Sequence, residues 1–403
     1  MTRRRILAIV AVGSALVLTA GAAVVATTVL APAELVEERV FLPSGNTPPP
    51  PPDPIVQYAA DRLSTMTLEQ KIASMLMVHA PGLDPAAWAA TASSGVCGMI
   101  LMGDNVPAPE SDLAAFTAVG TPEAGLPVLY AIDQEGGIVR RIFADEWPSA
   151  YELRFQDPSA ARDAFSGRAT MLDGLGVDIN FGIVADVTAD PGSFIYERTL
   201  GDDAGSAAAR VAEAVTGEAG AVLSTLKHFP GHGVSPGDSH SSIPGTAMTL
   251  DEWRAGHAPP FQAGIEAGAG VVMFGHLRFD AVDGLPATLS PAWHAMLRDE
   301  LGFDGIIVTD DMTMLQNSGE AAYADQLSNA IAAINAGNTM LVYVGPVDVA
   351  GLVSGIAAAV GDGRIDEAIV DDAATRLLEL RRTISGETGR FSACLDECQA
   401  VIE

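Results

Sequence analysis

The sequence predicts an α/β protein built as a single (β/α)8 barrel of the TIM type. Short, nearly continuous apolar runs alternate with Ala-rich helical stretches, as expected for parallel strands that helices cover on both faces. Almost every apolar run also ends in a polar or ionisable residue, and the strand ends of a barrel are where active sites are built. A doubly wound sheet is the alternative fold, but no G-x-G-x-x-G follows the first strand.

The first 33 residues predict export. Three arginines precede an uncharged run from Ile6 to Ala33. A signal peptide has an apolar core of roughly 7–15 residues, whereas a spanning helix needs about 20. Residues 1–33 are therefore predicted to be a signal peptide or an N-terminal membrane anchor that contacts the bilayer, with the arginines on the inner side. Ala31-Pro32-Ala33 offers a small-residue cleavage site.

A proline-rich linker is expected over residues 34–54. Its five consecutive prolines, Pro48–Pro52, favour polyproline II, a stiff extended spacer. The barrel domain is then expected over residues 55–403.

The domain opens with a predicted helix over 61–79, where Thr67 and Gln70 form a capping pattern. Two further helices are expected over 204–219 and 319–336. Seven buried strands are predicted, and an eighth is only weakly marked. The strands lie in the runs GVCGMILMG, LPVLYAID, VDINFGIVAD, AVLSTLKH, GVVMFGH, FDGIIVTDD and NTMLVYVG.

Ionisable residues at the strand ends are the candidate site. They are Asp104, Asp133, Asp186, Lys227–His228, His276 and Asp310–Asp311. In a barrel these side chains converge on one face.

Composition excludes one class of partner. The formal net charge is −29, so nucleic acid would be repelled. Cys394 and Cys398 fit neither a redox motif nor a four-ligand zinc site, and in an exported protein they would allow a local disulfide. We expect no cofactor.

The stretch KHFPGHGVSPGDSH, residues 227–240, holds three of the seven histidines. His228, His232, Asp238 and His240 are residue types that suit zinc. However, the spacing from 228 to 232 would suit a helix, and the Pro230-Gly231 pair makes a helix improbable there. We therefore expect no metal, with a metal-dependent hydrolase kept as an alternative.

Together with IDQEGGIVRR and GIIVTDDM, this stretch resembles the family-3 glycoside hydrolases, in particular the bacterial β-N-acetylglucosaminidases (β-N-acetylhexosaminidases). The similarity extends over nearly all of the chain from about residue 61. It implies a barrel without the second α/β domain of larger family members.

The resemblance implies a catalytic set. Asp310, the first Asp of VTDDM, would be the nucleophile, and Asp238 with His240 would form an acid/base dyad on a mobile loop. An imidazole exchanges protons near neutral pH, and a carboxylate on one ring nitrogen fixes its tautomer. Asp311 would have a supporting or helix-capping role.

The resemblance also implies substrate-binding residues. They are Asp133, Arg141, Arg198, Lys227 and His228, while His232 would support the loop.

These residues predict an exported, retaining β-N-acetylglucosaminidase that removes terminal β-linked GlcNAc from peptidoglycan-derived saccharides or muropeptides. The expected form is a monomer, anchored on the outer face of the membrane or secreted to the cell wall. A β-glucosidase or a β-GlcNAc phosphorylase is the alternative within the family. A non-catalytic wall-binding module is the alternative outside it.

Overall fold

The computed structural model describes residues 53–118, 123 and 125–391. The predicted export segment, the linker up to residue 52 and the pair Cys394 and Cys398 lie outside the described residues. In the part of the chain that is described, no helix is long and apolar enough to cross a membrane.

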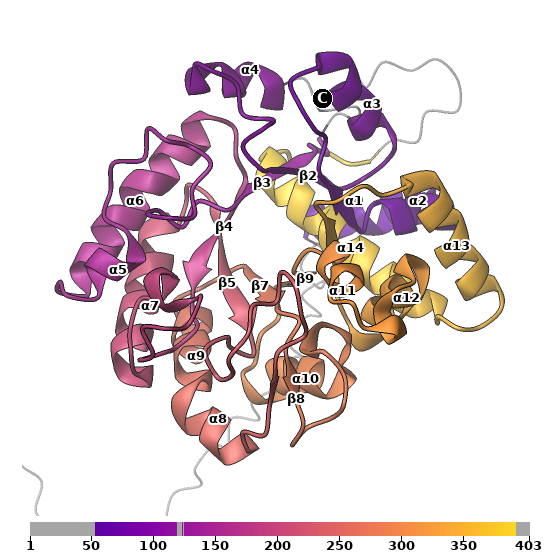
Figure 1. The fold of residues 1–403 in the computed structure, drawn as a ribbon. Coiled ribbons are helices and arrows are strands. Elements are labelled where there is room, and N and C mark those ends of the chain that lie inside the picture. Colours follow the sequence, from indigo (N-terminus) through magenta and orange to yellow (C-terminus); the bar gives the residue numbers. More distant parts are fainter. Residues whose placement is uncertain (1–52, 119–122, 124, 392–403) are drawn as a thin grey trace, which may run out of the picture. The chain divides into compact units, whose positions relative to one another are not determined.

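The described residues form a barrel of eight parallel strands surrounded by helices (Figure 1). The strand order is β10-β1-β2-β3-β4-β5-β7-β9. The ring closes where the Thr309 amide donates to the Met340 carbonyl and the Met340 amide donates to the Ile307 carbonyl. The barrel strands are β1 (Leu76–Val78), β2 (Gly98–Leu101), β3 (Leu129–Ile132), β4 (Ile179–Val184), β5 (Leu223–Phe229), β7 (Val271–Phe274), β9 (Ile306–Thr309) and β10 (Leu341–Tyr343). A separate parallel pair joins β6 (Gly245–Thr246) to β8 (Arg278–Phe279).

The helices follow the strands along the chain. The α-helices are α1 (Pro54–Leu63), α2 (Leu68–Ala73), α3 (Pro85–Ser93), α4 (Leu113–Thr117), α5 (Ala150–Leu153), α6 (Ser159–Gly174), α7 (Ala204–Glu218), α8 (Leu250–Gly256), α9 (Ala258–Glu266), α10 (Pro291–Ala295), α11 (Thr313–Asn317), α12 (Gln326–Ala336), α13 (Val349–Gly361) and α14 (Glu367–Ser385). Short 3-10 turns are η1 (Glu110–Asp112), η2 (Tyr196–Arg198), η3 (Ala287–Leu289) and η5 (Ala321–Tyr323), and η4 (Met296–Glu300) is a π turn.

All seven predicted strands are confirmed, but the single helix predicted over 61–79 is wrong. The capping box at Thr67 and Gln70 is present, and it starts the short helix α2 rather than sitting inside a longer one. The last residues of the predicted helix instead form β1, an eighth strand whose position the sequence did not predict. Its apolar residues Leu76–Val78 are buried on both faces, and such a short run does not distinguish a strand from a helix by periodicity.

Two other boundaries differ from expectation. Pro54, assigned to the linker, begins α1, because Asp53 caps the helix and Pro suits its first turn. The helix expected from 319 begins only at Gln326, where Asp325 accepts from the Ser328 amide.

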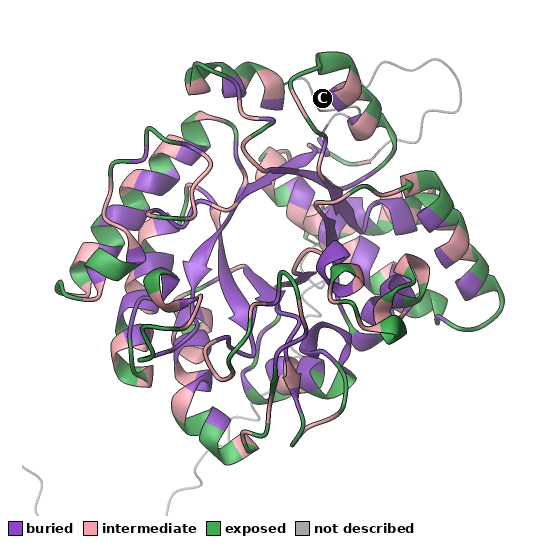
Figure 2. Ribbon diagram, viewed as in Figure 1, coloured by how far each residue is buried: buried purple, intermediate pink, exposed green. Residues whose placement is uncertain are grey.

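Successive residues of β9 belong to different buried clusters, and Figure 2 shows the strands buried beneath a partly exposed helical layer. Ile306 and Val308 belong to one buried cluster, together with Val271 and Met273 of the neighbouring strand. Ile307 belongs to a different cluster. Because side chains alternate along a strand, Asp310 continues the face of Ile306 and Val308.

Candidate active site

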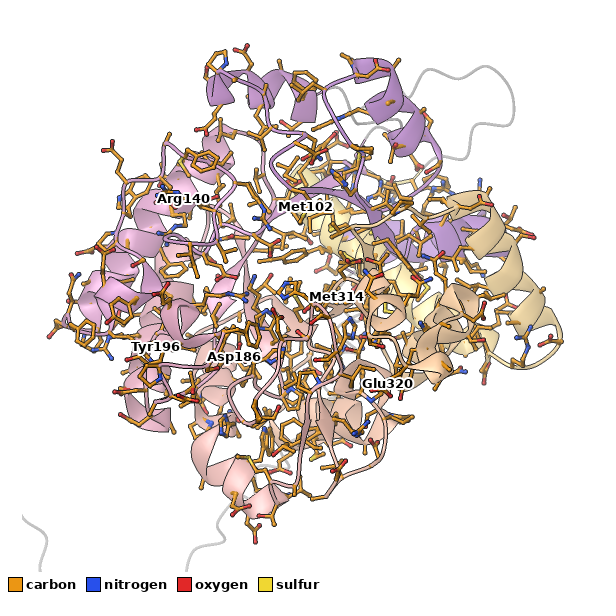
Figure 3. The ribbon with its side chains drawn as sticks, in the orientation of Figure 1. Met102, Arg140, Asp186, Tyr196, Met314 and Glu320 are labelled. Carbon is orange, nitrogen blue, oxygen red and sulfur yellow. The ribbon has the colours of Figure 1, made fainter. Side chains whose placement is uncertain are left out.

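A cavity of about 340 Å³ opens at the carboxyl ends of the strands. It is lined by every predicted site residue except Asp238, which contacts His240 in the wall. Apolar side chains complete the lining, and Figure 3 labels two of them, Met102 and Met314. The volume falls within the range of about 300–1,000 Å³ that is usual for small-ligand sites.

Charged side chains from the end of β3, the loop after it and the end of β5 pair along one wall. The Lys227 ammonium lies 2.9 Å from Oδ1 of Asp133. The other carboxylate oxygen of Asp133 accepts from Arg141 at 3.3 Å. The backbone amide of Arg141 is held by the side chain of Gln134, so the loop after β3 is fixed on both sides. This wall presents fixed donors and acceptors of the kind that sugar hydroxyls need.

Glu135 belongs to the same wall and was not predicted as a site residue. Its carboxylate accepts two hydrogen bonds from Arg198, at 2.9 and 2.8 Å, and pairs with Lys227 at 2.7 Å. Burial by itself would raise the pKa of Glu135, but attraction to Arg198 and Lys227 outweighs it and lowers the pKa to about 2. Glu135 is therefore a fixed anion that positions two of the predicted substrate-binding cations. A second acid in the DQEGG motif was the available signal.

His228 is oriented by a buried carboxylate. Asp186 at the end of β4 lies 2.7 Å from Nδ1 of His228 and also accepts from the His232 amide. Burial would raise the pKa of Asp186, yet attraction to His228 and the hydrogen bonds from it lower the pKa to about 2. With Nδ1 facing Asp186, Nε2 of His228 faces the cavity side, 3.3 Å from Arg198.

The two aspartates of VTDDM differ in their partners. Both oxygens of Asp311 are occupied, since Oδ1 accepts from the amides of Thr313 and Val344 and Oδ2 accepts from the Thr313 hydroxyl. Asp310 accepts only from the Asp311 amide, through Oδ1 at 2.8 Å, among the residues described. Burial acts to raise the pKa of Asp310, but attraction to His228 and His276 exceeds it and lowers the pKa. Asp310 is thus an ionised carboxylate with one oxygen available to a ligand.

His240 lies on the loop that follows β5. Its Nδ1 is 2.5 Å from Oδ1 of Asp238, and the same oxygen accepts from the His240 amide at 3.0 Å. Partial burial would raise the pKa of Asp238, but these hydrogen bonds lower it. The His240 side chain is 63% exposed, so this imidazole is held by its carboxylate rather than by packing.

Between these two residues the loop is fastened to the barrel. Ser239 is buried, and its hydroxyl lies 3.0 Å from Nε2 of His232. Burial lowers the pKa of His232 to about 3, so its ring stays neutral. Gly233 permits the close packing, because its φ is +92° and a Cβ there would lie 2.3 Å from the Val187 carbonyl oxygen.

The remaining strand-end residues have other partners. Asp104 pairs with His79 at 2.9 Å, and Asp104, Asp186 and His276 are not among the side chains that line the cavity. His276 contacts the Asp311 carbonyl and the Thr288 hydroxyl. Within the described ranges, no group of His, Cys, Asp and Glu side chains is arranged to hold a metal ion.

A family model fits this arrangement. The model described as "Glycosyl hydrolase family 3 N terminal domain" matches residues 67–380. The chain belongs to glycoside hydrolase family 3. It is therefore a glycoside hydrolase, as its sequence predicted.

Curated relatives support the assignment. A beta-hexosaminidase of Methylococcus capsulatus is 33% identical over 253 residues, which cover 61% of this chain and 74% of the relative. One from Stenotrophomonas maltophilia is 35% identical over 232 residues, covering 54% of this chain and 68% of the relative.

Solved structures share the fold. M tuberculosis LpqI matches with a TM-score of 0.71 at 28% identity, covering 79% of this chain and 95% of that protein. A beta-N-acetylhexosaminidase from Beutenbergia cavernae matches with a TM-score of 0.68 at 30% identity, covering 78% and 98%.

If the Ser239–His232 hydrogen bond holds the loop, then removing it should increase the motion of the loop. Ser239→Ala should speed amide hydrogen exchange across residues 235–242 by roughly twofold to tenfold, because one hydrogen bond contributes about 0.5–1.5 kcal/mol. Ser241→Ala is the control, since Ser241 is exposed on the same loop. Equal exchange in both variants would show that the contact does not hold the loop.

Proposed function

We propose that the protein is an exported, retaining β-N-acetylglucosaminidase that releases terminal β-linked GlcNAc from peptidoglycan-derived saccharides. One observation supports the mechanism: among the described residues, Asp310 is the carboxylate of the cavity with an oxygen that neither a cation nor a hydrogen-bond donor occupies, whereas both oxygens of Asp311 accept hydrogen bonds. The other acids that line the cavity are in ion pairs. Asp133 pairs with Lys227 and Arg141, and Glu135 pairs with Lys227 and Arg198.

In the first step, the free oxygen of Asp310 attacks the anomeric carbon. The bond to the leaving-group oxygen breaks, and His240 donates its proton to that oxygen. The result is a glycosyl ester on Asp310 and a neutral imidazole on His240. Asp238 stabilises the imidazolium before the transfer and keeps the ring in the required tautomer.

In the second step, water attacks the anomeric carbon of the ester. His240 accepts a proton from this water, the bond to Asp310 breaks, and the carboxylate is restored. Two displacements at the same carbon retain the anomeric configuration. A histidine replaces the second carboxylate of the usual pair, and its exposed position on a loop lets it meet both leaving group and water.

Sugar recognition is assigned to the rigid wall. Asp133 offers acceptor atoms to the cavity, Arg141, Lys227 and Arg198 offer donors, and His228 offers a ring nitrogen. The pairings with Glu135 and Asp186 hold these groups in place before substrate arrives. Preorganised partners of this kind stabilise the transition state without reorganising.

A phosphorylase is the second candidate, favoured by one observation. The acid/base is an imidazole, and a neutral imidazole would not repel an incoming phosphate as a carboxylate would. Phosphate would then replace water in the second step and leave a sugar 1-phosphate.

The place of action is proposed from the N-terminus. Residues 1–33 combine three arginines with a long uncharged run, which supports transfer of the domain across the membrane, anchored or secreted. Outside the membrane, the wall glycan is a source of β-linked GlcNAc. We propose that the domain acts there as a monomer on small saccharides or muropeptides.

Activity assays test this function. We expect turnover of p-nitrophenyl β-GlcNAc well above that of the β-glucoside, with no dependence on phosphate and no loss in EDTA. A rate that rises with phosphate, together with sugar 1-phosphate in the products, would establish the phosphorylase instead. Preference for the glucoside would overturn the substrate assignment.

The proposed role of His240 predicts that its loss slows substrates with poor leaving groups more than substrates with good ones. His240→Ala should slow a disaccharide by about 10²–10⁴-fold, because a sugar alkoxide needs a proton as it leaves. Nitrophenolate does not, so ester formation from the aryl substrate should stay comparatively fast, with ester breakdown limiting the rate. Azide needs no general base and should restore turnover.

Asp238→Ala should show a weaker form of the same split, since Asp238 only orients and polarises the ring. Equal slowing of both substrates by His240→Ala, without azide rescue, would remove His240 from the acid/base role.

A further inference from the structure

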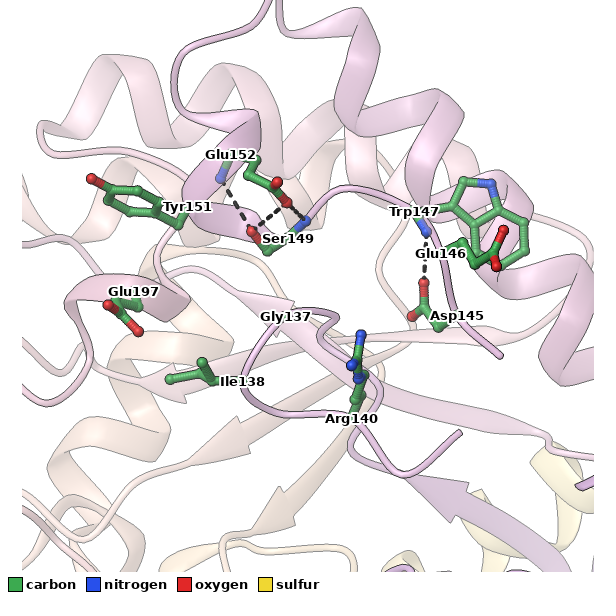
Figure 4. Close-up of a pocket in the computed structure, with 10 residues that line it drawn as sticks. All are labelled: Gly137, Ile138, Arg140, Asp145, Glu146, Trp147, Ser149, Tyr151, Glu152 and Glu197. Atoms are coloured by element: carbon green, nitrogen blue, oxygen red, sulfur yellow. Dashed lines mark hydrogen bonds between the residues drawn. The ribbon is translucent and has the colours of Figure 1, made fainter. Parts of the chain in front are cut away.

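A second hollow, of about 560 Å³, lies beside the catalytic cavity (Figure 4). Ile138, Tyr151 and Glu197 lie along one side of it, and Arg140 lies on the other. None of these side chains has a part in the two displacement steps, so the hollow is not explained by the chemistry above.

The hollow and the catalytic cavity share two walls. The turn after β3 places Val139 and Arg141 in the catalytic cavity and Ile138 and Arg140 in the hollow. The turn η2 likewise places Arg198 in the cavity, while its neighbour Glu197 lines the hollow. A ligand that extends out of the cavity over either turn therefore enters the hollow.

Aromatic side chains lead from the acid/base to this hollow. Phe194 packs edge-on against His240, with ring centroids 6.3 Å apart. Two residues further on, the Tyr196 ring lies 5.9 Å from Tyr151. The leaving-group oxygen must lie beside His240 to receive its proton, so the sugar attached to that oxygen leaves the cavity on the His240 side. The segment from Phe194 to Tyr196 therefore connects the proposed acid/base to the lining of the hollow.

The lining of the hollow suits a sugar ring. Ile138 is 64% exposed and Tyr151 is 39% exposed, although both are large apolar side chains. Phe155, which contacts the Tyr151 ring at 5.3 Å, is 73% exposed and extends the apolar surface. Exposed apolar side chains that gather beside a cavity mark a binding surface. Pyranose rings present apolar C–H faces that stack on such groups, while Arg140 and Glu197 can pair with the hydroxyls at the ring edge.

We propose that this hollow is the subsite for the saccharide on the leaving-group side of the scissile bond. The inference rests on the proposed function and extends it to substrate length: chains of two or more sugars should be preferred to aryl glycosides through contacts with Tyr151 and Ile138.

Kinetics on short and long substrates test the subsite. Tyr151→Ala and Ile138→Ala should lower kcat/KM for the β-1,4-linked GlcNAc trisaccharide about fivefold to tenfold, the effect of losing one interface contact worth about 1 kcal/mol or slightly more. Turnover of p-nitrophenyl β-GlcNAc should stay within twofold. Val56→Ala is the matched control, because Val56 is 50% exposed on α1 and lines neither cavity.

Calorimetry on the Asp310→Ala protein measures binding of the same trisaccharide without turnover. Adding Tyr151→Ala to this protein should weaken the binding to a similar extent. Unchanged binding and unchanged trisaccharide kinetics would overturn the subsite, as would equal loss on both substrates. Wild-type protein that binds the trisaccharide but hydrolyses no β-GlcNAc substrate would instead count against the proposed function and leave the subsite standing.

Discussion

The buried carboxylate of Glu135 is the interaction on which the rest of the site depends. It pairs with Lys227 and Arg198 in the lining of the cavity, at distances of 2.7 to 2.9 Å. Removing one partner from such a group leaves an uncompensated buried charge, which costs several kcal/mol. The same cations reach the cavity, where Lys227 also neutralises Asp133. Asp133 and Glu135 are held in ion pairs, and both oxygens of Asp311 accept hydrogen bonds. Among the described acids of the cavity, this leaves Asp310 with a free oxygen, which is why we propose it as the nucleophile.

Two parts of the site differ in how firmly they are held. The wall that we propose to bind sugar lies at strand ends and is held to the barrel by buried ion pairs. The proposed acid/base instead sits on a loop, with the His240 side chain mostly exposed and fastened through Ser239 to His232. This difference fits the proposed chemistry. Substrate recognition benefits from rigid partners, whereas the acid/base must first reach the leaving group and then the attacking water.

The sequence predicted the barrel well because parallel strands buried on both faces leave nearly continuous apolar runs. It missed β1, since Leu76–Val78 continue the apolar pattern of the preceding helix without a break. The catalytic and sugar-binding residues came from resemblance at particular motifs, and the structure brings all of them to one cavity or its wall. Glu135 was not predicted, because its pairing with Lys227 joins residues far apart in the sequence and depends on the tertiary structure. Asp104 was grouped with the site because position at a strand end does not reveal whether a neighbour such as His79 already binds it.

Trapping the covalent intermediate tests the central claim most directly. An activated fluoro-sugar analogue of β-GlcNAc, which forms the ester faster than water removes it, should add one sugar mass to the protein. Peptide mapping by mass spectrometry should place that mass on Asp310, and Asp311→Ala, which keeps this carboxylate, should still be labelled. A label on any other residue, or labelling that survives in Asp310→Ala, would contradict the account.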